Sequence, residues 1–316
     1  MASISVEGLA KSFGRVPALL PTSFEVAPGE VFGLIGPDGA GKTTLMRLLV
    51  SLLLPDAGSA RVDGLDVVKD FRELRRRVGY MPGRFSLYQD LSVRENLDFF
   101  ATIFGASVAE NRGLVDDLYL QLEPFEKRRA GALSGGMKQK LALCCALIHR
   151  PRVLFLDEPT TGIDAVSRRE LWEMLGRLRA AGITLLVSTP YMDEASRCDR
   201  VALIEGGRIL AIERPGDLAA RYRYPLLAVE GGPRIALLEA LRSLPQARSV
   251  YPFGSTIHFT DQRLGADPAA LAAELVGALE GRGLEGLGAQ PIEAGIEDVF
   301  MALAVDTRQA GEAHHG

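Results

Sequence analysis

The chain has 316 residues, of which 47% are hydrophobic and 24% are charged, and its 36 Lys and Arg against 40 Asp and Glu give a formal net charge of −4. This length suffices for one large and one small domain, each with a buried core. The composition excludes a disordered or fibrous chain, and the slight acidity gives no indication of a nucleic-acid or anionic-membrane partner.

Apolar segments and cysteines favour a cytoplasmic protein. The longest apolar runs, such as residues 141–148, fall short of the roughly 20 residues that a membrane-spanning helix needs. The N-terminus lacks the charged-then-apolar pattern of a secretory signal, which favours a cytoplasmic location. Cys144, Cys145 and Cys198 have no metal-ligand spacing, so we expect buried, reduced thiols.

The first 230 residues alternate short β-branched runs with longer amphipathic ones, a pattern typical of an α/β domain. Continuous apolar runs at 31–35, 153–157 and 184–188 predict strands that are buried on both faces of a largely parallel sheet. Residues 200–212 instead predict a hairpin that turns at two adjacent glycines.

Strand signals disappear over about residues 83–150, which predict a helical insertion within a domain that spans 1–225. After that domain the chain becomes rich in Ala, Leu and Gly, and segments of strand and helix character alternate. We therefore expect a small α+β domain over 226–305, followed by a disordered tail at 306–316.

The stretch LIGPDGAGKTTL matches the phosphate-binding pattern G-x-x-x-x-G-K-[ST] between a predicted strand and a predicted helix. In such a loop the backbone N–H groups turn toward phosphate oxygens, and the following helix offers its positive N-terminal end. Lys42 would neutralise the outer phosphates, and Thr43 would ligate magnesium. The nucleotide-binding residues predicted here are Gly36, Asp38, Gly39, Ala40, Gly41, Lys42, Thr43 and Thr44.

The stretch VLFLDEP predicts an apolar strand that ends in two carboxylates, Asp157 and Glu158. Asp157 is predicted to hold magnesium through water, and Glu158 is predicted to be catalytic because it can orient and polarise the attacking water. Acidic residues at a strand end are weak evidence alone. The phosphate-binding loop upstream makes the catalytic interpretation the preferred one.

The stretch LSGGMKQK, which starts at Leu133, predicts the beginning of a helix. Ser134 can cap this helix, and Gly135 and Gly136 leave backbone N–H groups exposed to an anion. An ordinary helix cap would explain these three residues equally well. Their position shortly before the acidic strand is the feature that marks one family.

With these motifs in this order, residues 1–225 resemble the nucleotide-binding subunits of ABC transporters, P-loop ATPases with a helical insertion. The terminal IEDVFMALA further resembles ATPases of drug- and antibiotic-export systems. The resemblance implies ATP and Mg²⁺ as cofactors and an ATPase that energises a membrane exporter. It also implies that Phe13 stacks on adenine and that Asp164, in TTGID, lies at the position called the D-loop.

The resemblance further implies a head-to-tail dimer with a second ABC ATPase subunit or domain, either identical or different. In such a dimer ATP lies between the phosphate loop of one subunit and the signature serine and glycines of the other. A separate polytopic permease would hold the dimer at the inner face of the cell membrane. Phe85, Leu87 and Tyr88, at the start of the insertion, are our candidates for contacting that permease.

Three residues depart from the family pattern. Gly83 stands where the family has a glutamine that senses magnesium and water, and Gln89 lies too far along the chain to replace it. Pro190 stands where a histidine normally contacts the terminal phosphate, and it offers no side-chain hydrogen bond. Asp38 replaces the usual asparagine, which is electrostatically unfavourable beside a polyphosphate unless the side chain points away.

Three functional hypotheses follow. The first is an ATPase subunit that energises an exporter of the multidrug or antibiotic efflux type. The second is a degenerate site that binds ATP, hydrolyses it slowly because of Gly83 and Pro190, and is paired with a second, competent ABC ATPase. The third is a soluble ABC protein that acts on ribosomes or DNA, which the single nucleotide-binding domain and the absence of a basic patch argue against.

Overall fold

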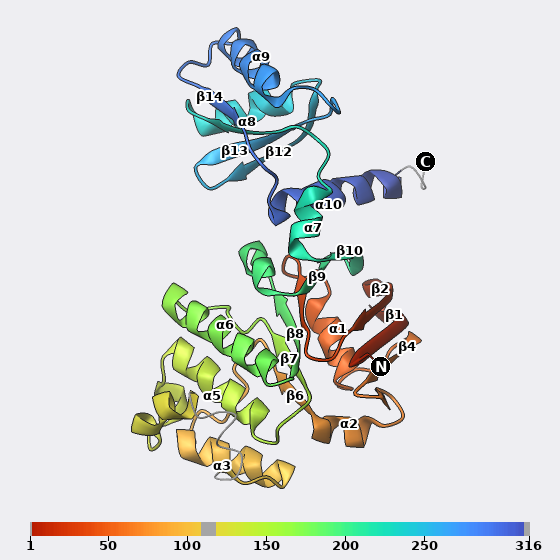
Figure 1. Cartoon of the computed structure of the whole chain (residues 1–316), viewed down its shortest axis with the longest axis vertical. Helices are drawn as coiled ribbons and strands as arrows, with labels where there is room; N and C mark the ends of the chain where they lie inside the picture. The colour runs from red at the N-terminus through yellow and green to blue at the C-terminus, as the bar shows by residue number, and fades with distance from the viewer. Residues whose placement is uncertain (1, 109–117, 313–316) are drawn as a thin grey trace. The chain divides into compact units, whose positions relative to one another are not determined.

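The computed structural model describes residues 2–108 and 118–312 and divides into two compact units, Met1–Arg214 and Pro215–Gly316 (Figure 1). The division between the units falls after Arg214, and the sequence pattern placed the domain boundary at 225. The reason is the short helix α7 (Pro215–Ala220), which contacts α10 (Ile296–Glu312) of the second unit.

A six-stranded sheet in the order β10-β9-β3-β8-β7-β6 forms the centre of the first unit. Its strands are β3 (Val31–Ile35), β6 (Val78–Met81), β7 (Val153–Asp157), β8 (Thr184–Thr189), β9 (Arg200–Glu205) and β10 (Arg208–Glu213). All are parallel except β10, which pairs antiparallel with β9 and confirms the predicted hairpin. Every residue of β3, β7 and β8 is buried, as the continuous apolar runs predicted.

A second, four-stranded sheet in the order β2-β1-β4-β5 completes the α/β body. Its strands are β1 (Ile4–Phe13), β2 (Val16–Val26), β4 (Ala57–Val62) and β5 (Leu65–Asp66). Helix α1 (Lys42–Leu49) contacts both this sheet and β7 of the larger one. Its apolar residues are fully buried in the core between them, which makes α1 the helix that fixes the two sheets together.

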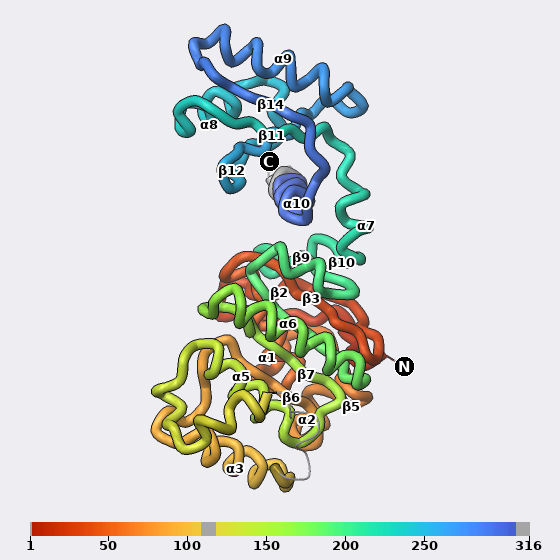
Figure 2. Tube along the Cα trace, turned by 60° about the vertical axis from the view of Figure 1, so that its left-hand side comes forward, coloured from red at the N-terminus to blue at the C-terminus, as the bar shows by residue number. Residues whose placement is uncertain are grey.

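The predicted helical insertion contains α3 (Val93–Phe104) and α5 (Gly135–Leu147), which pack side by side (Figure 2). Ser92 and Glu95 form a capping box at the start of α3, and Gly105 ends it in the left-handed conformation. Residues 109–117, part of a further predicted helix, lie outside the described residues. The other helices of this unit are α2 (Phe71–Arg77), α6 (Ala165–Ala180) and the 3-10 turns η1 (Glu123–Phe125), η2 (Ala130–Ala132) and η3 (Met192–Arg197).

The three cysteines are free and buried, as predicted from their spacing. Cys144 and Cys145 lie in α5, and Cys198 follows η3. Burial raises the pKa of each thiol well above its ordinary value, because the thiolate would lose its hydration. These groups therefore act as packing residues.

The second unit is a four-stranded antiparallel sheet in the order β12-β13-β11-β14. Its elements are β11 (Leu226–Glu230), α8 (Arg234–Arg242), β12 (Ala247–Phe253), β13 (Thr256–Asp261), α9 (Pro268–Glu280) and β14 (Gly288–Pro291). Apolar residues of β11 and β13 form a core with α8 and α9. Helix α10 continues to Glu312, past the residue at which the sequence predicted a disordered tail to begin.

Alternation along β13 gives the second unit a polar interior beside its apolar core. Ile257 and Phe259 belong to that core, so His258 lies on the other face of the strand. There the buried carboxylate of Asp298, from α10, accepts a hydrogen bond from the Tyr251 hydroxyl at 2.8 Å. The same carboxylate oxygen lies 2.7 Å from Nδ1 of His258. This hydrogen-bonded cluster fastens α10 to β12 and β13.

We expect the stability of the second unit to fall as the pH rises above 10.0, the ordinary pKa of tyrosine. Burial, and then the Asp298 charge, raise the pKa of Tyr251, so the folded unit keeps its proton while the unfolded chain loses it. Burial also raises the pKa of Tyr222 to about 12. Each tyrosine then removes about 1.4 kcal/mol of unfolding free energy per pH unit within this window.

Urea unfolding of the full chain, followed by circular dichroism from about pH 8 to about pH 11, measures this slope. Tyr251→Phe should lower the unfolding free energy at neutral pH by about 1 kcal/mol and flatten the alkaline decline. Tyr224→Phe, a neighbouring tyrosine outside the Asp298 cluster, is the control and should keep the decline. An unchanged slope in Tyr251→Phe would contradict the prediction.

Candidate active site

The loop between β3 and α1 is built on glycines that no other residue could replace without moving the backbone. A Cβ atom at Gly36 would lie 2.0 Å from the carbonyl oxygen of Ile204, and one at Gly41 would lie 2.5 Å from that of Ala18. Gly39 and Gly41 also adopt positive φ angles of 79° and 104°. The loop therefore curls tightly over the end of the sheet.

A cavity of about 200 Å³ lies within this loop. It is lined by Ala18, Gly39, Ala40, Gly41, Lys42, Thr43, Thr44 and Glu158. All but two of the predicted loop residues therefore line one cavity at the N-terminal end of α1. Of the exceptions, Gly36 accepts a hydrogen bond from Lys42, and Asp38 is exposed and does not line the cavity.

Lys42 is almost fully buried, at 3% exposure, and its ammonium group is held at three points. Nζ donates to the carbonyl oxygens of Gly36 at 2.8 Å and Pro37 at 3.0 Å. It also lies 3.1 Å from Oε1 of Glu158, the predicted catalytic carboxylate. The cation and the carboxylate thus meet in the cavity where phosphates are expected.

Asp157 and Glu158 follow one another at the end of β7 but face different partners. Asp157 is 2% exposed, and its Oδ1 accepts from Oγ of Ser188 at 2.6 Å and from Oγ1 of Thr43 at 3.2 Å. Hydroxyl and carboxylate oxygens are the ligands that Mg²⁺ prefers, so Thr43 and Asp157 fit a magnesium ion. Glu158 has a φ of 51°, in the left-handed region that few residues other than glycine adopt.

Ser188 was not predicted as a site residue. It is the fifth residue of β8, and its register partner in the parallel neighbour β7 is Asp157. A hydroxyl near the end of an apolar strand was a visible signal, but the strand order that brings it to Asp157 was not.

Gly83 lies directly against the acidic pair. A Cβ atom there would be 3.0 Å from the carbonyl oxygen of Asp157 and 3.7 Å from Cβ of Glu158. Gln89 lies elsewhere: its carbonyl accepts from the backbone N–H of Gly131, before the signature motif. Gln89 therefore does not replace the missing glutamine. Pro190 directly follows β8 and brings no side-chain donor to the site.

The signature residues form a contact of their own with the TTGID segment. Oγ of Ser134 accepts from the backbone N–H of Met137 and caps α5. A Cβ atom at Gly136 would lie 2.5 Å from Oγ of Ser167, and one at Gly135 would lie 3.2 Å from a backbone oxygen. Both glycines are therefore needed for packing as well as for free N–H groups. The Asp164 carboxylate caps α6 by accepting hydrogen bonds from the backbone N–H groups of Val166 and Ser167.

Phe13 ends β1 and is 52% exposed. Nζ of Lys11 lies 5.9 Å from the centre of its ring and is also paired with Asp56 at 2.6 Å. The ring does not line the phosphate cavity. An exposed aromatic ring beside a cation provides a surface on which a base can stack.

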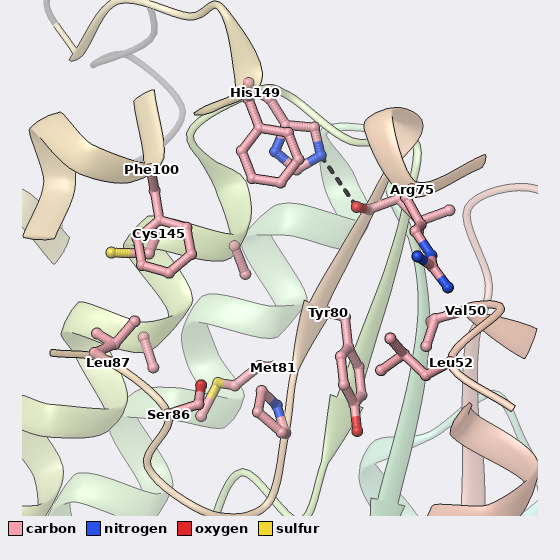
Figure 3. Close-up of a pocket in the computed structure, with 15 residues that line it drawn as sticks. Val50, Leu52, Arg75, Tyr80, Met81, Ser86, Leu87, Phe100, Cys145 and His149 are labelled. Carbon is pink, nitrogen blue, oxygen red and sulfur yellow. Dashed lines mark hydrogen bonds between the residues drawn. The ribbon is translucent and has the colours of Figure 1, made fainter. Parts of the chain in front are cut away.

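A second cavity, of about 150 Å³, lies between the sheet and the helical insertion. Figure 3 shows Leu87 and Phe100 on one side of it and Leu52 and Tyr80 on the other. His149 Nε2 bonds the carbonyl oxygen of Val78 at 3.1 Å, the dashed line in Figure 3. The walls of this second cavity are mostly apolar, which is typical of a site that binds a hydrophobic group.

The three residues that we expected to contact a permease differ in exposure. Leu87 is buried, at 7% exposure, because it lines the second cavity, so it is not available on the surface. Phe85 is half-buried beneath Nζ of Lys138, at 5.6 Å from the ring centre. Tyr88 is 51% exposed and meets Phe99 edge to face.

Comparisons with known proteins agree on one family. The family model described as "ABC transporter" matches residues 19–161. The chain is 44% identical over 252 residues to the "Probable multidrug ABC transporter ATP-binding protein YbhF" of Escherichia coli, covering 78% of the chain but only 43% of YbhF. It is 41% identical over 308 residues to the "Nod factor export ATP-binding protein I" of Burkholderia thailandensis, covering 96% of this chain and 97% of that protein.

A solved structure described as "Structure of ATP binding subunit of ABC transporter" matches with a TM-score of 0.64 and 29% identity, over 69% of this chain and 92% of the other. Within residues 2–108 and 118–312, no helix has the length and apolar character of a membrane span. Similarity along almost the whole chain, together with the phosphate loop and acidic strand around one cavity, identifies the protein: it belongs to the ATP-binding subunits of ABC transporters and is an ABC-type ATPase.

Proposed function

We propose that this subunit binds and hydrolyses ATP, with Mg²⁺, to energise a membrane exporter of the multidrug or antibiotic efflux type. The observation that carries the proposal is the convergence of four side chains, in which Lys42 lies 3.1 Å from Glu158 and Thr43 lies 3.2 Å from Asp157. The names of the two relatives, a multidrug transporter protein and a Nod factor export protein, support export. Nothing in the comparisons favours the degenerate-site alternative.

Each of these side chains has a proposed task in hydrolysis. Thr43 and Asp157 would hold Mg²⁺, which supplies positive charge to the phosphate oxygens. Lys42 would bind the outer phosphates, and Glu158 would orient the attacking water and take its proton. Because Lys42 is paired with Glu158 in this structure, arriving phosphates compete for the ammonium group. ATP binding would therefore free the Glu158 carboxylate for catalysis.

The exposure of the signature motif supports a second ABC ATPase subunit or domain as partner. Ser134 and Gly135 are exposed at the N-terminal end of α5, and neither lines the phosphate cavity of its own chain. A helix N-terminus with free backbone N–H groups attracts an anion. The phosphates of a nucleotide held by another subunit would provide that anion.

The second cavity supports a polytopic permease as the other partner. Its apolar lining continues to exposed Leu52, at 50%. Among the described residues that line it, the cation is Arg75, whose Nε donates to Oγ of Ser51 at 2.9 Å. Such a groove fits the apolar face of a short helix. We propose that a helix from the permease occupies it and holds the ATPase at the inner face of the membrane.

Replacing Glu158 by glutamine should abolish turnover but preserve nucleotide binding. We expect kcat to fall by about 10²–10⁴-fold because the general base is lost. ATP affinity should stay equal or increase, since Lys42 loses its charged partner in the empty site. Steady-state phosphate release and calorimetric titration with ATP measure the two effects.

Glu173→Gln, which changes an exposed glutamate on α6 that is paired with Arg169, is the matched control and should leave both quantities unchanged. Wild-type turnover in Glu158→Gln would contradict the assigned role. Absence of magnesium-dependent turnover in the wild-type chain, with or without a permease, would contradict the proposed function itself.

A charge placed in the second cavity should break the permease contact without affecting hydrolysis. We expect Leu52→Glu to weaken association with a polytopic membrane protein encoded beside this chain by about tenfold or more, since burial of a carboxylate beneath an apolar helix face costs well over 1.4 kcal/mol. Co-purification from detergent extracts measures association. Ile103→Glu, at a 59% exposed residue of α3 that does not line the cavity, is the control. Equal association of both variants would count against this docking site.

A further inference from the structure

We propose that Ser188 is a positioning residue for hydrolysis, whose single hydroxyl holds both the carboxylate of Asp157 and the backbone N–H of Glu158. This inference rests on the ATPase activity proposed above. It concerns a residue that neither the phosphate-binding pattern nor the acidic strand motif contains.

The first contact of Ser188 is with the buried carboxylate. Its Oγ donates to Oδ1 of Asp157 at 2.6 Å, a shorter distance than the 3.2 Å from Oγ1 of Thr43 to the same oxygen. Ser188 is fully buried and Asp157 is 2% exposed, so water does not compete for this hydrogen bond. A buried hydrogen bond to a charged acceptor is among the stronger kinds in proteins.

The second contact is with the backbone of the catalytic residue. The N–H of Glu158 donates to Oγ of Ser188 at 3.0 Å and to its carbonyl oxygen at 3.1 Å. Glu158 has a left-handed backbone, with φ of 51°, which a non-glycine residue keeps only when its surroundings hold it there. The same hydroxyl thus donates to one acidic residue and accepts from the next.

The parallel register of β7 and β8 explains how one side chain reaches both residues. Asp157 and Ser188 are register partners, so their side chains point to the same face of the sheet. Glu158 follows immediately, where β7 has ended, and its amide turns back to β8. We call these two contacts of the Ser188 hydroxyl, with the Asp157 carboxylate and the Glu158 N–H, the clamp. The clamp therefore results from the pairing of β7 with β8.

This chain depends on the clamp because the neighbouring positions offer no substitute. Gly83 lies against the acidic pair without a side chain, and Pro190 brings no donor. Within the described residues, only Ser188 and Thr43 make side-chain hydrogen bonds to the Asp157 carboxylate. If Thr43 ligates Mg²⁺, its hydroxyl is engaged there, which leaves Ser188 to orient Asp157.

The experiment compares Ser188→Ala, which removes the hydroxyl, with Ser188→Thr, which restores it. Thr184→Val is the matched control, because Thr184 is an equally buried hydroxyl on the same strand that bonds Gly29 and Ser3 instead. For each variant we would measure kcat, KM for ATP and the unfolding midpoint. The affinity for Mn²⁺, a paramagnetic substitute for Mg²⁺, would be measured by electron paramagnetic resonance in the presence of ADP.

We expect Ser188→Ala to lower both kcat and the Mn²⁺ affinity by about 10–100-fold, the usual effect of losing a group that orients a metal ligand. KM for ATP should stay within about twofold, because the phosphate loop is intact, and Ser188→Thr should recover both quantities. Thr184→Val should change only the unfolding midpoint.

Wild-type Mn²⁺ affinity and kcat in Ser188→Ala would overturn the proposal. So would an equal loss of Mn²⁺ affinity in Thr184→Val, since that would indicate a general effect on folding. The Mn²⁺ affinity is measured with ADP and does not require turnover. The comparison of Ser188→Ala with Thr184→Val therefore tests the role of Ser188 even if Ser188→Thr does not fold. A failure of the proposed ATPase function would instead appear in the wild-type chain, as absent turnover.

Discussion

The parallel pairing of β6, β7, β8 and β3 is the constraint on which the candidate site depends. Parallel strands end at the same edge of a sheet, so the segments that follow them meet there. The phosphate loop follows β3, the acidic pair ends β7, Ser188 lies near the end of β8 and Gly83 follows β6. Residues far apart in the chain thus form one site because their strands are neighbours.

Glycine serves several physical purposes around this edge. In the phosphate loop it permits positive φ angles and close approach to the backbone of Ile204. In the signature motif, Gly136 leaves room for the hydroxyl of Ser167 and brings α5 against α6. The contact joins the signature motif to the segment that follows β7.

One expectation failed because it depended on contacts between distant segments. Leu87 was expected on the surface, but the packing of α3 and α5 against the sheet creates a cavity that it lines. This outcome does not follow from local composition, because it depends on packing against segments that are distant in the chain.

The sequence by itself determined the phosphate loop, the acidic strand, the buried strands and the family, since each depends on short stretches whose backbone needs and burial are visible in residue order. Only the tertiary structure decided that Lys42 pairs with Glu158, that Ser188 clamps the acidic pair, and that Gln89 lies away from it. These contacts join residues on different strands and loops. They depend on strand order and register, which short-range patterns do not contain.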